Sequence, residues 1–320
     1  MRIRFGYVAN NLSLWDGSPS STMTFRHWST LSAAERQRKL EATAAHNLET
    51  TLRILHYNVA QGIPLYRMSS SLIPLATHPE VQWDYSQRFQ TLFREIGTFS
   101  KTHQLRLSMH PNQFTLFTSD RDDITANAIS DMLYHQQVFE QMELSQRGVI
   151  NIHVGGAYGD KKAAIERFYS NLSRLPKKAR LLMTLENDDR TYNAEETLAI
   201  CQQANIPMVF DYHHHKALPS ERSLEDLLPS IFATWKRSPF KPKVHLSSPR
   251  NAKEFRKHAE FVDPAFVRPF FHLATSLGIE FDVMIEAKQK EQALLALLSQ
   301  LEKERRVKRL AGGVLDWPTP

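Results

Sequence analysis

Three features are scarce in this chain, and each scarcity excludes a class of protein. Cys201 is the one cysteine among 320 residues, so the chain cannot form an internal disulfide or a metal site built from several cysteines. Glycines number only 11. No GxGxxG, GxxxxGKS or GxxxxGKT motif follows a predicted strand, so we expect no nucleotide cofactor.

Long apolar runs are missing as well. The longest, Ala293 to Leu298, is far too short to cross a bilayer. The first fifteen residues contain no continuous apolar segment of the kind found in signal peptides. We therefore expect a cytoplasmic protein with no membrane partner.

The composition that remains is typical of a packed globular protein. Hydrophobic residues make up 42% of the chain and charged residues 23%, which argues against disorder, collagen-like repeats and coiled coil. Lysine and arginine number 40 against 34 aspartates and glutamates, a formal net charge of +6. This excess leans toward a polyanionic partner, although charge bears on association rather than on fold. Fourteen histidines are the unusual count.

Strand-like and helix-like segments alternate along the whole chain. The predicted strands cover Arg2 to Val8, Leu65 to Ser69, Leu105 to His110, Val149 to Val154, Arg180 to Glu186, Pro207 to Asp211, Lys243 to Leu246 and Phe281 to Ile285. The predicted helices cover Ser32 to Leu55, Asp84 to Thr102, Asp123 to Leu144, Lys161 to Leu175, Ala194 to Ala204, Leu224 to Trp235, Pro264 to Leu277 and Lys288 to Lys303.

About eight βα units without an internal linker predict a single (β/α)8 TIM barrel over residues 1–320. An open, doubly wound parallel sheet is the alternative, because the strand count is the weakest part of the prediction. Ser32 and Glu35 form a capping-box pattern that marks the start of the first long helix. The basic tail from Glu302 to Leu310 is interpreted as a solvated helix end.

Metal-type ligands stand at the carboxyl end of most of the later predicted strands. They are His110, His153, Glu186, Asp211, His245 and Glu286. In a barrel the side chains at these ends can point into the mouth, where such enzymes carry out chemistry. Converging carboxylates and imidazoles need a cation, and six of them exceed one tetrahedral zinc. Two or three divalent metals are therefore predicted, with Glu186 as the bridging carboxylate.

Three further residues have two interpretations each. His214 follows Asp211 by three residues and could turn back over the mouth or lie on the surface. His258 is placed on a helix after the Lys243 strand, where a lone histidine is usually a surface residue. Lys243 precedes His245 by two residues and would face the metals, which lowers its pKa and permits carboxylation by carbon dioxide. If the strand instead starts at Val244, Lys243 is an ordinary solvated lysine.

The sequence resembles the UV damage endonucleases, which are ATP-independent DNA repair nucleases, over nearly its whole length. The matching segments are Gly6-Tyr7 with Asn11, Tyr66 to Ser70, Ser108 to Pro111 with Gln113, His153 to Gly156, Leu185 to Asp188, Asp211 to His214, Lys243 to His245 and Met284 to Lys288. Together these motifs are specific, whereas none would be so alone.

The resemblance implies a TIM barrel similar to the endonuclease IV type of nuclease, with up to three divalent metals. Manganese is implied, with zinc and magnesium as alternatives. One ion would be held by His110, His153 and Glu186. A second would be held by Glu186, Asp211, His245 and Glu286. The third would be held by His214, His258 and a carboxylated Lys243. Glu186 and Lys243 would thus be the catalytic residues.

The resemblance also implies a set of DNA contacts. Tyr7 and Asn11 would line the lesion site, and Gln113 with Phe114 would probe the damaged bases. Phe114 stands where tyrosine can occur, so ring stacking is kept but a hydroxyl hydrogen bond is lost. Candidate phosphate contacts are Arg67, Arg250, Lys253 and Lys257.

On this basis we expect a metal-dependent endonuclease that nicks double-stranded DNA. The cut would fall immediately 5′ of cyclobutane pyrimidine dimers and 6-4 photoproducts and leave a 3′-hydroxyl. Such an enzyme would associate with the nucleoid while it acts. Three alternatives stay open: an abasic-site endonuclease of the endonuclease IV type, a metal-dependent sugar isomerase on the same barrel, and a catalytically silent DNA-binding scaffold.

Overall fold

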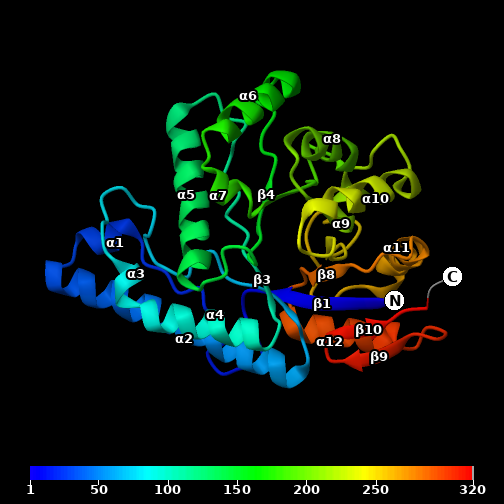
Figure 1. Cartoon of the computed structure of the whole chain (residues 1–320), viewed down its shortest axis with the longest axis horizontal. Coiled ribbons are helices and arrows are strands. Elements are labelled where there is room, and N and C mark those ends of the chain that lie inside the picture. The colour runs from blue at the N-terminus through cyan, green and yellow to red at the C-terminus, as the bar shows by residue number, and fades with distance from the viewer. Residues whose placement is uncertain (319–320) are drawn as a thin grey trace.

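Eight parallel strands form the centre of the molecule in the computed structural model, which describes residues 1–318 (Figure 1). The strands are β1 (Arg2–Val8), β2 (Leu65–Arg67), β3 (Arg106–Ser108), β4 (Ile150–His153), β5 (Met183–Glu186), β6 (Met208–Asp211), β7 (Lys243–Leu246) and β8 (Asp282–Ile285). Their order in the sheet is β3-β2-β1-β8-β7-β6-β5-β4. A parallel bridge between Met109 and Ile150 joins the two ends of this path, so the sheet closes as the predicted TIM barrel and not as an open sheet.

Helices surround the barrel, as the alternating pattern predicts. They are α1 (Phe25–Ser29), α2 (Ala33–Gln61), α3 (Tyr85–Arg88), α4 (Gln90–Thr102), α5 (Asp122–Gln141), α6 (Lys161–Ser173), α7 (Lys177–Arg180), α8 (Ala194–Ala204), α9 (Tyr212–Ala217), α10 (Leu224–Ala233), the 3-10 helix η1 (Thr234–Arg237), α11 (Pro264–Ser276) and α12 (Lys290–Leu301). The predicted capping box is present, since the Ser32 side chain accepts from Glu35 N and Glu35 accepts from Ser32 N. Helix α2 runs past its predicted end and stops at Gly62, whose φ of 65° suits glycine.

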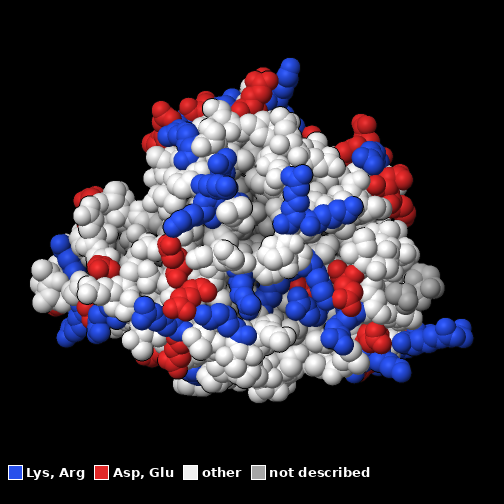
Figure 2. Space-filling model, viewed as in Figure 1, with Lys and Arg blue, Asp and Glu red and all other residues white. Residues whose placement is uncertain are grey.

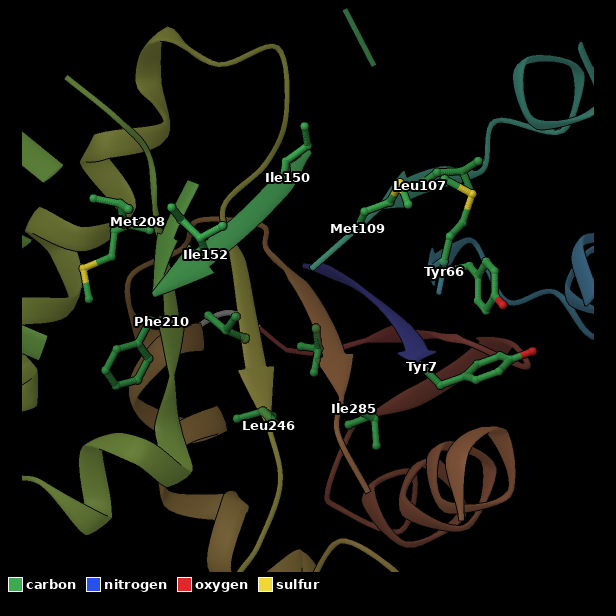
Figure 3. Close-up of a cluster of buried hydrophobic side chains, with 14 of the residues drawn as sticks. Tyr7, Tyr66, Leu107, Met109, Ile150, Ile152, Met208, Phe210, Leu246 and Ile285 are labelled. Carbon is green, nitrogen blue, oxygen red and sulfur yellow. The ribbon is translucent and has the colours of Figure 1, made fainter. Parts of the chain in front are cut away.

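The core lies between the strands and the surrounding helices. Side chains from most strands meet in the apolar cluster of Figure 3, and Phe210 and Ile285 are both fully buried. Tyr7 and Tyr66 lie side by side there, with ring centroids 5.6 Å apart. Strands buried on both faces need continuous apolar runs. Polar side chains are left for the strand ends.

Four local predictions are wrong. Residues 177–180 form α7, so β5 begins at Met183 rather than at Arg180. The segment after Asp211 is not a loop but the short helix α9. The helix predicted from Asp84 is interrupted at Phe89, which separates α3 from α4. His258 lies outside any helix and forms an isolated antiparallel bridge with Pro249.

The basic tail is also different from its prediction. Helix α12 ends at Leu301, and the tail turns and enters β9 (Lys308–Ala311), which forms a hairpin with β10 (Val314–Asp316) instead of ending as a solvated helix. Strand β10 pairs with the first three residues of β1. Strand β2 does not pair with any of these three residues, and β8 pairs only with Arg4 among them. Because an open strand edge favours pairing with any available strand, the hairpin protects this end of β1.

Among residues 1–318, the structure contains no helix that is long and apolar enough to span a membrane.

Candidate metal centre

The six strand-end ligands converge at the carboxyl end of the barrel. The potential ligand atoms fall into three groups, each within 4.8 Å: His110, His153 and Glu186; Glu186, Asp211 and His214; Glu186, His245 and Glu286. Each residue comes from a different strand end except Asp211 and His214, which flank the start of α9. Parallel strands all end at the same side of a barrel, and this is why ligands from strand ends far apart in the sequence meet.

Glu186 belongs to all three groups and is 1% exposed. Its Oε2 lies 3.3 Å from His110 Nε2, and its Oε1 lies 3.1 Å from His245 Nδ1. The Asn151 amide donates a hydrogen bond to Oε2 and holds the carboxylate in place. Burial alone would raise the pKa of Glu186, but His245 and His153 hold it well below its ordinary value. Glu186 is therefore a carboxylate anion placed to be shared among cations.

Several buried polar atoms in this cluster have no hydrogen-bond partner within residues 1–318. They are Asp211 Oδ2, His153 Nδ1 and His245 Nδ1. His110 Nδ1 lies 2.8 Å from the Pro111 carbonyl oxygen, which can only accept, so Nδ1 carries the proton. The lone pair of His110 Nε2 then faces the Glu186 anion. Unpaired lone pairs that face one another in a buried site fit bound divalent cations, and this set of nitrogen and oxygen donors suits Mn²⁺ or Zn²⁺.

Without a cation, His245 and His214 favour their protonated forms. Burial opposes the charged form of His245, but Glu186 and Glu286 outweigh it and raise its pKa to about 9. Burial opposes the charged form of His214 likewise, and Asp211 and Glu186 raise its pKa to about 9. Burial raises the pKa of Asp211 to about 6. Metal binding here would therefore release protons.

Helix α9 brings His214 into the cluster. Asp211 Oδ1 accepts a hydrogen bond from His214 N at 2.7 Å and so caps the helix. His214 Nδ1 lies 2.9 Å from Asn187 O, which leaves Nε2 available. Asp211 thus groups with His214 and Glu186, whereas the resemblance placed it with His245 and Glu286. The Asn187 side chain was not expected to take part. Its Nδ2 donates to Asp211 O and its Oδ1 accepts from Asp211 N, both at 2.9 Å.

His258 lies at the edge of the centre. Its ring is 6.3 Å from that of His214, outside the three ligand groups. His213, on α9, packs against the His258 segment with its ring 5.5 Å from that of His258, and it was not among the expected ligands. Its Nδ1 is 2.7 Å from Ser247 Oγ and its Nε2 is 2.5 Å from Phe255 O. The run of three histidines was the available signal, but spacing alone does not say which member supports and which binds.

Lys243 is the first residue of β7 and is 2% exposed, so the solvated alternative is wrong. Burial lowers the pKa of Lys243 well below its ordinary value, and Arg106 lowers it further. The described residues offer its amine no hydrogen bond or ion pair. Lys243 is in register with Asp282 of β8, two residues before His245 on β7, and Arg106 and Asp282 are the charges that act on its amine most strongly. A neutral amine in this position is chemically competent for carboxylation.

The expected DNA contacts divide into buried and exposed residues. Tyr7 and Asn11 are 0% and 2% exposed, which leaves no surface for direct contact with DNA. Gln113 and Phe114 are exposed, the latter to 71%. Arg67 forms an ion pair with Glu286 and is only 17% exposed. It therefore supports a ligand of the centre instead of extending into solvent.

The basic residues after β7 lie on the surface. Arg250 pairs with Glu254 at 3.1 Å, Lys257 pairs with the same carboxylate, and Lys253 is exposed. Figure 2 shows lysine and arginine spread over one face among acidic side chains rather than gathered in an unbroken patch. The basic excess by itself therefore does not locate a DNA site.

Comparison with known families identifies the chain. The model of the family described as UV-endonuclease UvdE matches residues 3–318. The chain belongs to the UV-endonuclease UvdE family. A UV DNA damage endonuclease of Bacillus cereus (strain B4264) is 55% identical over 317 residues, which are 99% of this chain and 100% of that protein. A relative from Bacillus mycoides (strain KBAB4) with the same name and coverage is also 55% identical.

Solved structures agree with this assignment. The crystal structure of SacUVDE is 30% identical with a TM-score of 0.84, over 94% of this chain and 98% of that one. These matches confirm the resemblance drawn from the UvdE motifs and the barrel that it implied. They concern the family and the fold, and they leave the role of each ligand in this UvdE member as a prediction.

Proposed function

We propose that this UvdE-family protein is a metal-dependent endonuclease that nicks double-stranded DNA immediately 5′ of cyclobutane pyrimidine dimers and 6-4 photoproducts. The cut would leave a 3′-hydroxyl on the fragment upstream of the lesion and a 5′-phosphate on the fragment that contains the lesion. The observation that supports the proposal most is the shared carboxylate Glu186, which belongs to three ligand groups in a family of UV endonucleases. Two or three divalent ions, with Mn²⁺ as the proposed metal, would occupy those groups.

Bound cations would supply a nucleophilic water at neutral pH and would neutralise charge on the phosphoryl oxygens. The protein's own residues prepare this chemistry. Asn151 and Asn187 orient the ligands Glu186 and Asp211 through hydrogen bonds. Such supporting bonds fix ligand geometry and typically change metal affinity or activity by about 10- to 100-fold when lost. Arg67 holds Glu286 toward His245.

Lesion selectivity has a physical basis in base stacking. A photoproduct stacks poorly, so it costs less free energy to extrude from the duplex than a normal pair. Gln113 and Phe114 are exposed after β3 and would reach the distorted bases. Exposed basic residues such as Lys253 would add affinity for the backbone that depends on salt.

Lys243 has a proposed role as a carboxylated lysine. Its buried amine has a depressed pKa and no partner among the described residues. The neutral amine would attack carbon dioxide, form the new C–N bond and lose a proton, which leaves a carbamate anion. Mass spectrometry of the intact folded protein checks this, because an acid-labile gain equal to one carbon dioxide should disappear in Lys243→Arg.

The deciding experiment is a nicking assay with purified protein and Mn²⁺. Matched duplexes carry a pyrimidine dimer, a 6-4 photoproduct, an abasic site or no lesion. We expect cutting of both photoproduct duplexes at the 5′ side and none of the undamaged one. Exclusive cutting at the abasic site would favour the endonuclease IV type of activity. Absence of any lesion-dependent nick, with metal bound, would overturn the proposal.

A further inference from the structure

The segment that follows β1, residues 9–18, presents the most exposed of the large hydrophobic side chains among the described residues. Trp15 is 90% exposed, whereas the other four tryptophans are buried or partly buried. A fully exposed indole on a soluble surface is unusual because it leaves a large apolar area in water. The residues around it show whether this exposure is accidental.

Buried polar side chains hold the 9–18 segment rigidly. Glu291, fully buried at the start of α12, accepts hydrogen bonds from Leu12 N and Ser13 N, both at 2.8 Å. Asn11 Oδ1 accepts from Ser13 N and Leu14 N, both at 3.0 Å. At the tip, Arg53 donates to Trp15 O at 2.5 Å. These bonds fix the backbone directly on both sides of the exposed side chain.

The same network explains why Tyr7 and Asn11 are buried. The Tyr7 hydroxyl donates to Asn58 Oδ1 and accepts from Asn11 Nδ2, each at 2.8 Å. Asn11 N also donates to Gly17 O at 2.8 Å and closes the segment, and a side chain at Gly17 would collide with Asn11 O. All polar atoms of these two side chains therefore serve the 9–18 segment. Their role is to position it, and the group that it offers to a partner is Trp15.

Position in the fold indicates what the partner is. Residues 9–18 leave the carboxyl end of β1, so they lie on the rim of the same mouth as the metal ligands and Phe114. Strand β1 is flanked by β2 and β8, which carry the Arg67–Glu286 pair. A rigid aromatic side chain binds nucleic acid bases by stacking with little loss of conformational freedom.

We propose that Trp15 stacks on a base exposed by the lesion and is a further specificity-determining residue of the DNA interface. This inference rests on the proposed function, since it needs damaged DNA at the mouth. Stacking of one base on an aromatic side chain changes affinity by about 5- to 150-fold. The contribution should be larger for a damaged duplex than for an intact one, because an intact duplex keeps its bases stacked on each other.

The test compares Trp15→Ala, Trp15→Leu and Trp15→Phe in a Glu186→Gln background, which keeps the DNA uncut. Binding to a duplex with one photoproduct and to its undamaged match is measured by fluorescence anisotropy. We expect Trp15→Ala and Trp15→Leu to weaken binding of the damaged duplex by about 5- to 150-fold and Trp15→Phe to keep most of it. Leu181→Ala is the matched control, because Leu181 is 73% exposed at the opposite end of the barrel.

A second readout is direct. Stacking on a base should quench the fluorescence of an exposed indole, so the quenching seen when the parent binds DNA should be lost in Trp15→Phe. Because the indole buries almost nothing, the thermal stability of these variants should equal that of the Glu186→Gln parent. If Trp15→Ala binds the damaged duplex as tightly as its parent, the inference is overturned. If Trp15→Leu binds the damaged duplex as tightly as its parent, Trp15 does not act by base stacking. Wild-type protein that fails to nick photoproduct DNA overturns the proposed function instead, so the two failures are distinguishable.

Discussion

The two ends of the barrel both bury charged side chains, but they balance those charges differently. At the amino end, Asp282 is fully buried and accepts hydrogen bonds from Arg4 Nε at 2.7 Å and from Arg106 Nη1 at 2.6 Å. The Arg106 guanidinium also lies over the Phe240 ring, 4.6 Å from its centroid, and its Nε and Nη2 have no hydrogen-bond partner within residues 1–318. The protein thus supplies its own counter-charges at this end.

At the carboxyl end the balance is incomplete. Glu186, Asp211 and Glu286 meet histidines there, and Arg67 pairs with Glu286. In the part of the chain that the structure describes, Asp211 Oδ2 and two imidazole nitrogens have no hydrogen-bond partner. Desolvated charge is costly unless it is paired. The comparison teaches that a buried carboxylate paired with two of the protein's own arginines supports the fold, whereas three carboxylates that share one arginine and several histidines are prepared for an external cation.

The largest effect is expected from Glu186→Gln. The substitution keeps shape but removes the charge that all three ligand groups share, so nicking of photoproduct DNA should fall by more than about 100-fold, beyond the loss of a supporting bond. Folding and DNA affinity should be nearly unchanged. Nicking rates and circular dichroism check this, with Glu95→Gln as the control, because Glu95 is exposed on α4. Near-normal nicking would contradict the shared-carboxylate arrangement and with it the contrast between the two ends.

At the opposite end, Asp282→Asn should affect stability instead of chemistry. It leaves the buried Arg106 guanidinium and the partly buried Arg4 guanidinium without their anion, so the free energy of unfolding should fall by about 3–5 kcal/mol. Urea denaturation measures the loss. The control is Asp316→Asn, whose carboxylate is 48% exposed and pairs with the terminal amine, where less than about 1 kcal/mol is expected. Loss of bound metal from folded Asp282→Asn would contradict the separation of the two ends.

The loss of unfolding free energy in Asp282→Asn should depend on pH. Burial alone would raise the pKa of Asp282, but Arg106 and Arg4 hold it below its ordinary value. A carboxyl with a lowered folded-state pKa contributes stability above its unfolded pKa of about 4, and the contribution disappears as pH falls through the folded pKa. The difference between wild type and Asp282→Asn should therefore be constant near neutrality and shrink below about pH 4.

Adding Mn²⁺ should stabilise the protein through the carboxyl end alone. A ligand at about 100 times its Kd raises the free energy of unfolding by about 2.7 kcal/mol when it binds the folded state only. The gain should be the same in Asp282→Asn and much smaller in Glu186→Gln. Thermal unfolding with and without Mn²⁺ gives the comparison. Equal gains in the two variants would place the ions somewhere other than the mouth.

The smallest expected effect concerns surface charge. If Lys253 contacts a phosphate, Lys253→Ala should reduce the slope of log affinity against log salt by about one. Lys308, exposed on β9 at the amino end, is the matched control, and its replacement by alanine should leave the slope unchanged. Equal effects at both positions would mean that DNA is not held at one end of the barrel.

Much of the centre was predictable because strand geometry is regular. Side chains alternate along a strand and parallel strands end on one side of a barrel, so a ligand at each strand end predicts convergence without knowledge of any contact. This rule predicts that His110 and His245 lie close together, and in the structure both lie beside Glu186.

Residues beyond the strand ends were not predictable in this way. Whether His214 returns to the mouth depends on the hydrogen bond from its backbone to Asp211, which starts α9. His258 was predicted to lie on a helix, but its backbone forms an isolated β-bridge with Pro249. The local sequence pattern does not indicate this bridge. The β9–β10 hairpin depends on the uncovered end of β1, more than 300 residues away.

The sequence by itself determined the alternation of strands and helices, the UvdE motifs and the set of ligand types at the strand ends. These are local properties, governed by hydrophobic periodicity and residue chemistry. Only the tertiary structure decided which ligands share a group, that Tyr7 and Asn11 are buried supports, and that Trp15 is the exposed member of its segment. The reason is physical: burial and hydrogen-bond partnership are set by residues distant in sequence, such as Asn58 and Glu291, that the closed barrel brings together.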